Sequence, residues 1–213
     1  MSNQHSDAIK HQTIKGSVQI RPWLHYLTKT SNRILLAPFF RLQTNGKENL
    51  PKTSAFILLP KHQRWEDIPF LAIGTPRRLY YVAKYELFNN AISDWFFKSV
   101  GGIPLNRQDP LKTRRYLRDM NNLLERGEGV VVFPEGTYYR DKMGAGNVGI
   151  VRFILKRFSV PFIPVGINYT RKSLFTAVRI NFGKPLHEDP GTNPNEFLNR
   201  LMQEIAKLSG FDD

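Results

Sequence analysis

The chain has 213 residues, 41% of them hydrophobic, which fits one globular domain with a real core and excludes a disordered chain. It contains no cysteine, so disulfides, cysteine nucleophiles and thiolate metal sites are excluded. The formal net charge of +13 implies an anionic partner, and charge alone leaves nucleic acid, an anionic membrane and phosphorylated or acidic substrates open.

The N-terminal part of the chain divides into two segments. Residues 1–16 are expected to form a mobile polar leader, and they lack the cationic-then-apolar order of a secretory signal. Residues 17–45 mix aromatic and aliphatic side chains with Lys and Arg, which predicts one or two amphipathic helices broken near Ser31 and Asn32. Such a segment suits a membrane interface, and a helix packed on the domain fits equally well. No apolar run approaches the roughly 20 residues needed to span a bilayer.

A histidine and an aspartate flank the first predicted strand-to-helix turn. Residues 55–59 form an apolar run that predicts a buried strand, and Asp67 followed by Pro69 predicts a helix start. In α/β folds, chemistry gathers in the loops after strand ends. The spacing from His62 to Asp67 favours a turn, in which a carboxylate could hold the imidazole as a base and its orienter. A single histidine and aspartate at this spacing occur by chance in many proteins. The interpretation of this motif therefore depends on stretches that come later in the chain.

A second strand is predicted over residues 79–83, with Lys84 at its end. Residues 92–100 predict a short helix whose Trp95 belongs to an aromatic cluster, which could be core or could line an acyl-chain groove. The glycine pair at 101–102 predicts a tight turn, and Arg107 emerges after it. Arginine suits bidentate phosphate contact, although a single exposed arginine is more often a surface charge.

The strongest predicted strand, residues 129–133, delivers Glu135 and Gly136 at its end. A carboxylate there would need partners, and a glycine would let a ligand approach the backbone N–H. Residues 144–149 match the G-x-G-x-x-G pattern, but no strand precedes them and no acidic residue follows about 20 positions later. We therefore reject a dinucleotide site and expect a helix that runs to about residue 158.

The rest of the chain predicts a strand at residues 160–167, an outer strand at 178–183 and an amphipathic helix at 196–208. The alternation of strands and helices predicts one α/β domain, in which a mixed sheet is flanked by helices and preceded by an amphipathic N-terminal helical segment. No P-loop, G-x-S-x-G elbow, H-E-x-x-H motif or metal-ligand cluster is present.

Four stretches, KHQRWED, GGIPLNR, FPEGT and VPFIPVGI, stand in this order along the chain. Together they resemble the glycerolipid acyltransferase family, specifically the 1-acylglycerol-3-phosphate (lysophosphatidate) acyltransferases. The resemblance runs from about residue 50 to residue 185. It implies a glycerolipid acyltransferase-like fold. With the N-terminal segments described above, we expect a polar leader over residues 1–16, a membrane-associating segment over residues 17–45 and an acyltransferase domain over residues 46–213.

The resemblance also implies residue roles. His62 matches the general base, Asp67 the residue that orients it, and Lys84 a lysine near the site. The positions matched to acceptor binding are Arg107, Glu135, Thr137 and Arg140, and Gly136 shares the reacting centre with Glu135. Three departures stand out: Asn106 replaces a usual Asp, Lys61 replaces a common Asn, and Tyr138 and Tyr139 precede Arg140.

The chemistry also fits the residue types. Acyl transfer from a thioester to an alcohol requires deprotonation of a hydroxyl, which neutral imidazole can do when a carboxylate fixes its tautomer. The thioester is already activated, so neither a protein nucleophile nor a metal nor any other cofactor is expected. Lys84 and the Gly136 N–H are our candidates to stabilise the oxyanion.

The expected function is transfer of a fatty acyl group from acyl-CoA or acyl carrier protein to the sn-2 hydroxyl of 1-acyl-sn-glycerol 3-phosphate, giving phosphatidic acid. The protein would be peripheral, on the cytoplasmic face of an anionic membrane. One alternative is a family member with another acceptor: glycerol 3-phosphate, a lyso-amino-lipid or another lysophospholipid. The other is a basic nucleic-acid-binding protein. Two features argue against it: the charges are spread along the chain, and no nucleic-acid-binding motif is recognisable.

Overall fold

The computed structural model describes residues 18–105, 110–155, 157–187 and 193–211. The predicted leader at residues 1–16 and the candidate phosphate ligand Arg107 lie outside the described residues.

The described strands form one seven-stranded sheet in the order β1-β7-β6-β2-β5-β3-β4. Their bounds are β1 (Phe40–Asn45), β2 (Phe56–Pro60), β3 (Leu79–Lys84), β4 (Gly102–Leu105), β5 (Gly129–Val131), β6 (Phe162–Arg171) and β7 (Thr176–Phe182). Strands β6 and β7 pair antiparallel, and every other neighbouring pair is parallel. The predicted mixed sheet is therefore confirmed.

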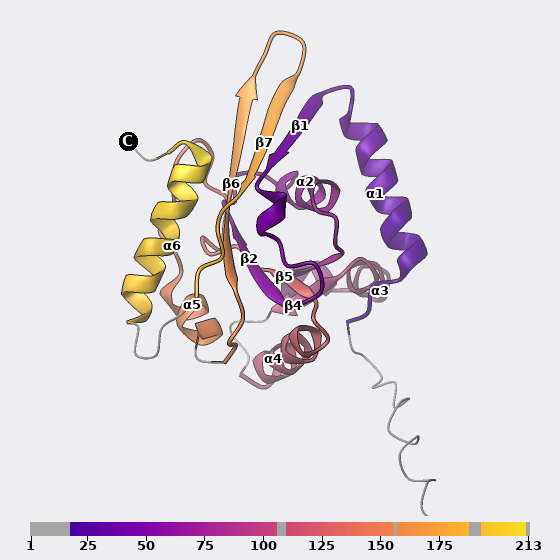
Figure 1. Cartoon of the computed structure of the whole chain (residues 1–213). Coiled ribbons are helices and arrows are strands. Elements are labelled where there is room, and N and C mark those ends of the chain that lie inside the picture. The colour runs from indigo at the N-terminus through magenta and orange to yellow at the C-terminus, as the bar shows by residue number, and fades with distance from the viewer. Residues whose placement is uncertain (1–17, 106–109, 156, 188–192, 212–213) are drawn as a thin grey trace, which may run out of the picture.

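Helices cover both faces of this sheet, and α1 and α6 lie on opposite sides of it (Figure 1). The helices are α1 (Pro22–Leu36), α2 (Asp67–Gly74), α3 (Ala91–Ser99), α4 (Pro110–Glu125), α5 (Val148–Leu155) and α6 (Pro194–Ser209), with short 3₁₀ helices η1 (Lys47–Asn49) and η2 (Tyr85–Phe88). Successive residues of β2 alternate between two core clusters, Ile57 toward α4, α5 and α6 and Leu58 toward α2. Because both faces are covered, the central strands read as unbroken apolar runs.

Parallel pairing positions the candidate site. Strands β2, β3 and β5 run in the same direction, so their carboxyl ends meet at one edge of the sheet. Three chain segments therefore converge at that edge: the loop after Pro60 of β2, the loop after Val131 of β5 and the end of β3 at Lys84. This is the edge at which α/β sheets place their ligands.

The structure departs from the sequence-based predictions at both edges of the sheet. Helix α1 is continuous through Ser31 and Asn32, so the predicted break is wrong; packing against α2 supports these weak helix formers. Residues 40–45 form strand β1 outside β7, so the sheet begins before residue 46 and β7 is not an edge strand. The glycine turn at residues 101–102 leads directly into β4, the opposite edge strand, which the sequence analysis did not predict.

Candidate active site

His62 lies in the turn between β2 and α2, and its ring meets the carboxylate of Asp67. The distance from Nδ1 of His62 to Oδ2 of Asp67 is 3.0 Å. The imidazole stacks on the ring of Phe133 beyond β5, with centroids 3.7 Å apart and planes at 24°. With Nδ1–H donating to the carboxylate, Nε2 keeps a lone pair that can accept a proton. The two side chains that the sequence pairs across this turn are therefore in contact.

The carboxylate of Asp67 is fixed from several directions. The residue is fully buried at the first position of α2. Its Oδ2 also accepts hydrogen bonds from the backbone N–H groups of Gln63, at 2.7 Å, and Arg64, at 2.8 Å. Its Oδ1 accepts from the hydroxyl of Tyr169 on β6, at 2.6 Å. Burial, and then the charge of Asp67, raise the pKa of Tyr169, so the hydroxyl remains a donor.

A buried ion pair lies next to the backbone of His62. Nζ of Lys61 is 2.9 Å from each carboxylate oxygen of Glu135 and 2.8 Å from the carbonyl oxygen of Tyr139. Glu135 also accepts from the backbone N–H of His62, at 2.8 Å, and of Gly144, at 2.6 Å. Burial lowers the pKa of Lys61, and the ion pair with Glu135 opposes that shift. The pair ties the loop after β2 to the loop after β5.

A cavity of about 440 Å³ opens at the carboxyl ends of β3 and β5. His62, Lys84 and Thr137 are among its polar lining residues. Much of the remaining lining is apolar. It comes from β3, β4, α2, η2 and the loop after β5, and it includes Val82, Leu87, Leu105, Ile68 and Phe133. A mostly apolar cavity with a few convergent polar groups suits a long-chain substrate whose reacting end is polar.

The two oxyanion candidates differ in their surroundings. Lys84 is exposed at the cavity, and its ammonium makes no hydrogen bond or ion pair within the described part of the chain. Gly136 lines the same cavity with φ of +68°, a conformation that favours glycine. Its N–H donates to the carbonyl of Phe133 at 3.1 Å, so this amide is satisfied within the turn. Among the described residues that line this cavity, Lys84 is the only Lys or Arg.

The other predicted site residues are divided. Thr137 lines the cavity, whereas Arg140 is exposed and outside its lining. Glu135 is buried, and its carboxylate accepts hydrogen bonds from Lys61 and from two backbone N–H groups, as expected for a carboxylate that needs partners. It does not line the cavity. The aromatic cluster around Trp95 on α3 does not line the cavity either; Trp95 instead packs under the guanidinium of Arg21.

Sequence reasoning missed two residues beside the dyad. Lys61 follows a strand end just as His62 does, and the search for a partner to Glu135 could have found it. Tyr169 carries no such signal, because its partner Asp67 lies 102 residues away in the sequence.

Two further findings concern only the residues that the structure describes. No group of three or more His, Asp or Glu side chains is arranged to hold a metal ion. None of the helices combines the length and the apolar character needed to cross a bilayer.

Comparisons with known proteins agree on a family. The acyltransferase family model matches residues 41–168. A chloroplastic 1-acyl-sn-glycerol-3-phosphate acyltransferase of Arabidopsis thaliana is 27% identical over 88% of this chain and 54% of its own length. A 1-acyl-sn-glycerol-3-phosphate acyltransferase of Bacillus subtilis is 28% identical over 73% of this chain and 79% of its own. The chain thus spans about half the length of the plant relatives it matches.

The fold has a counterpart among solved structures. The 1-acyl-sn-glycerophosphate acyltransferase of Thermotoga maritima superposes with a TM-score of 0.67 at 23% sequence identity, covering 88% of this chain and 77% of the other. The family match runs from β1 into β6, and it contains the His62–Asp67 dyad and the FPEGT loop. The chain therefore belongs to the acyltransferase family.

Proposed function

We propose that this protein transfers a fatty acyl group from acyl-CoA or acyl carrier protein to the sn-2 hydroxyl of 1-acyl-sn-glycerol 3-phosphate. The observation that carries the proposal is the contact between His62 and Asp67 at a mostly apolar cavity. The names of the plant and bacterial relatives support lysophosphatidate as the acceptor. The product would be phosphatidic acid.

The proposed reaction needs only groups that the cavity presents. Nε2 of His62 takes the proton of the sn-2 hydroxyl as its oxygen attacks the thioester carbonyl carbon. The new C–O bond leaves a tetrahedral oxyanion, which the ammonium of Lys84 stabilises. The C–S bond then breaks, and the proton on His62 passes to the departing thiolate. Donors of this kind are typically worth about 3 kcal/mol of the barrier.

We further propose that the protein lies on the cytoplasmic face of a membrane as a peripheral protein. The buried side of α1 carries Leu24 and His25, whereas its outward side exposes Trp23, Leu27 and Ile34 by 57%, 55% and 67%. An apolar helix face turned away from the domain, with cations nearby, supports insertion into a bilayer interface. The absence of cysteine fits the reducing cytoplasm, where acyl-CoA and acyl carrier protein occur.

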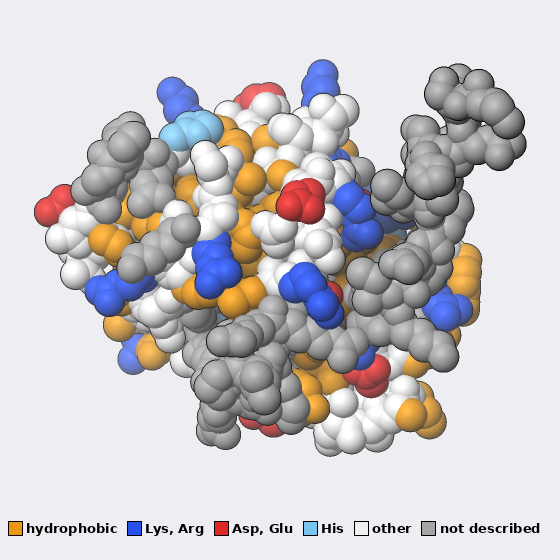
Figure 2. All heavy atoms as spheres, turned by 90° about the horizontal axis from the view of Figure 1, so that it is seen from below, with side chains coloured by type: hydrophobic (Ala, Val, Ile, Leu, Met, Phe, Trp, Pro, Cys, Tyr) orange, Lys and Arg blue, Asp and Glu red, His pale blue; other side chains and the backbone are white. Residues whose placement is uncertain are grey.

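The distribution of charge weighs against the nucleic-acid alternative. Figure 2 shows Lys and Arg side chains scattered among hydrophobic ones on the face turned to the viewer, rather than gathered in one stripe. A nucleic-acid-binding surface would concentrate them. Binding to RNA or DNA that weakens steeply with salt, without binding to anionic vesicles, would favour that alternative.

The general-base role predicts the effect of one substitution. His62→Ala removes the proton acceptor, so we expect turnover with lysophosphatidate and acyl-CoA to fall by roughly a hundredfold or more. His187→Ala, at an exposed position outside the cavity, is the matched control and should leave turnover unchanged. A smaller loss in the His62 variant would remove the general-base assignment.

An acceptor screen separates the alternatives within the family. One labelled acyl donor is offered with lysophosphatidate, glycerol 3-phosphate, a lyso-amino-lipid and a neutral lysophospholipid in turn. We expect the highest kcat/KM with lysophosphatidate. A higher value with another acceptor would replace the proposed substrate while leaving the dyad chemistry intact.

A further inference from the structure

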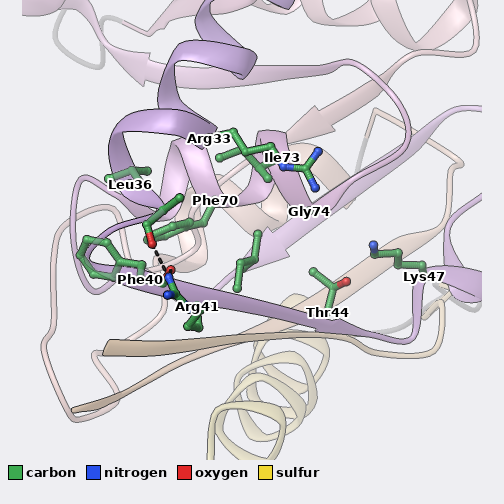
Figure 3. Close-up of a pocket in the computed structure, with 11 residues that line it drawn as sticks. Arg33, Leu36, Phe40, Arg41, Thr44, Lys47, Phe70, Ile73 and Gly74 are labelled. Carbon is green, nitrogen blue, oxygen red and sulfur yellow. Dashed lines mark hydrogen bonds between the residues drawn. The ribbon is translucent and has the colours of Figure 1, made fainter. Parts of the chain in front are cut away.

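A second cavity, of about 310 Å³, lies between α1, β1 and α2 and shares no lining residue with the catalytic one. Figure 3 shows Leu36, Phe40 and Ile73 among its apolar lining residues. Arg33 from α1 and Lys47 from the start of η1 also line it. The proposed function makes no use of this cavity.

The cations of this cavity have no acidic partners. Arg33, Arg41 and Lys47 line it, no acidic residue does, and none of the three forms an ion pair within the described ranges. Arg41 is partly engaged, because its Nη1 donates to the carbonyls of Ala37 and Phe40 near the end of α1. The remaining donors of the three side chains form a local positive field.

The charges of Arg33 and Lys47 also act on a neighbouring lysine. Lys29 lies one turn before Arg33 on α1 and donates to the carbonyl of Thr75 at 3.0 Å. Burial, and then the charges of Arg33 and Lys47, lower the pKa of Lys29. Repulsion among these side chains indicates that the surface would gain from an anion placed between them.

The apolar part of the cavity determines what kind of anion fits. Beside it, Ile34, Leu35 and Phe39 are exposed by 67%, 67% and 65%. These residues extend the apolar lining of Leu36 and Phe40 toward the outward face of α1. A small hydrated anion would leave this surface in water, whereas the chains of an amphiphile would cover it.

We propose that the cavity between α1, β1 and α2 binds the headgroup of an anionic phospholipid of the bilayer, at a site separate from the catalytic cavity. Arg33, Arg41 and Lys47 contact the phosphate, and the acyl chains lie along Leu35 and Phe39. The inference rests on the proposed placement of the protein on a membrane. It adds a lipid that is bound but not consumed.

The test is binding of the full chain to vesicles of phosphatidylcholine with or without phosphatidylglycerol, measured by cosedimentation. The double substitution Arg33→Gln and Lys47→Gln removes two cavity cations and leaves Arg41 on β1, whose side chain donates to the carbonyl of Ala37 after α1. Since each cation near an anionic surface is worth about 1 kcal/mol, we expect binding at least roughly tenfold weaker. The control, Arg200→Gln with Lys207→Gln on α6 across the sheet, removes the same two residue types and should change binding less than about twofold.

A cavity-filling variant distinguishes a specific binding site for one lipid headgroup from nonspecific electrostatic attraction to the membrane surface. Ile73→Trp leaves the net charge unchanged and occupies the cavity. We expect it to weaken binding to phosphatidylglycerol vesicles several-fold, with a thermal unfolding curve that shows a folded protein. Binding like the wild type, or equal losses in the two double variants, would mean diffuse attraction only and would overturn the proposal.

Two further arms complete the test. Inorganic phosphate, compared with chloride at equal ionic strength, should not displace the protein from phosphatidylglycerol vesicles; displacement would indicate a small-anion site and contradict the lipid assignment. His62→Ala should bind these vesicles like the wild type while lacking turnover. Failure of the lipid-site proposal in the vesicle assay can therefore be distinguished from failure of the proposed acyl-transfer function.

Discussion

Asp67 accepts three hydrogen bonds in addition to its contact with His62. One of its oxygens accepts from His62 and two backbone amides, and the other accepts from Tyr169. Such a set of hydrogen bonds satisfies the buried carboxylate and holds it in one rotamer. We therefore propose that Tyr169 is a positioning residue that acts through Asp67 on His62, the proposed base.

Tyr169→Phe removes the hydroxyl and leaves Oδ1 of Asp67 without that donor. We expect the free energy of unfolding to fall by about 1 to 3 kcal/mol. Since Tyr169 does not line the catalytic cavity, kcat should fall while KM stays near the wild-type value. Chemical denaturation and steady-state kinetics measure the two effects, and a change confined to KM would contradict the positioning role.

At the level of elements, the loops after β2 and β5 are held together by the pair of Lys61 and Glu135. Both side chains are fully buried, so removal of either leaves an unpaired charge in the interior. The backbone N–H of His62 also depends on this carboxylate. The pair therefore helps to fix the position of His62 relative to the cavity.

A double-mutant cycle tests this arrangement. Lys61→Met leaves Glu135 charged without its partner and should destabilise the protein by about 3 to 5 kcal/mol. Glu135→Gln should also destabilise it, because Lys61 then loses its counter-charge. The double variant Lys61→Met with Glu135→Gln should be more stable than the sum of the single losses predicts. Simple additivity in thermal or urea unfolding would rule out coupling between the two side chains.

Helix α1 presents a different kind of surface on each side. Replacing Leu27 and Ile34 by Asn changes two exposed side chains, so we expect little change in stability and a clear loss of vesicle binding. Leu24→Asn, at a buried position on the same helix, is the control and should destabilise the fold. Unchanged vesicle binding in the Leu27 and Ile34 variant would exclude the outward face of α1 as the membrane contact.

For the molecule as a whole, pH should act on stability through Tyr169. The pKa of this hydroxyl is raised above its ordinary value of 10.0 by burial and by Asp67, so ionisation favours the unfolded chain. The stability that Tyr169 provides is fully present below pH 10 and is lost as the pH rises further. Its loss has a slope of up to about 1.4 kcal/mol per pH unit.

This pH effect is measured as the difference in unfolding free energy between the wild type and Tyr169→Phe. We expect a constant difference below pH 10 and a shrinking one above it. A difference that stays constant well above pH 10 would mean that the hydroxyl ionises in the folded protein as easily as in the unfolded chain.

The central part of the molecule was predictable from the sequence because its signals are local. Each of these signals lies in a short stretch of sequence. They are the apolar runs of β2, β3 and β5 and the spacing from His62 to Asp67. Edge strands β1 and β4 were missed because one alternates polar and apolar residues beside an amphipathic helix, and the other follows directly on a glycine turn. Lys61 with Glu135 joins positions 74 residues apart, and no local pattern encodes that pairing.

Helix α2 is only eight residues long, yet its two ends serve two different surfaces. Asp67 at its first position contacts the imidazole of His62. Ile73 and Gly74 at its C-terminal end line the cavity between α1, β1 and α2. An α-helix rises about 1.5 Å per residue, so Asp67 and Ile73 are only about 9 Å apart along the helix axis. A substitution in the proposed lipid cavity, such as Ile73→Trp, should therefore be assayed for turnover as well as for vesicle binding.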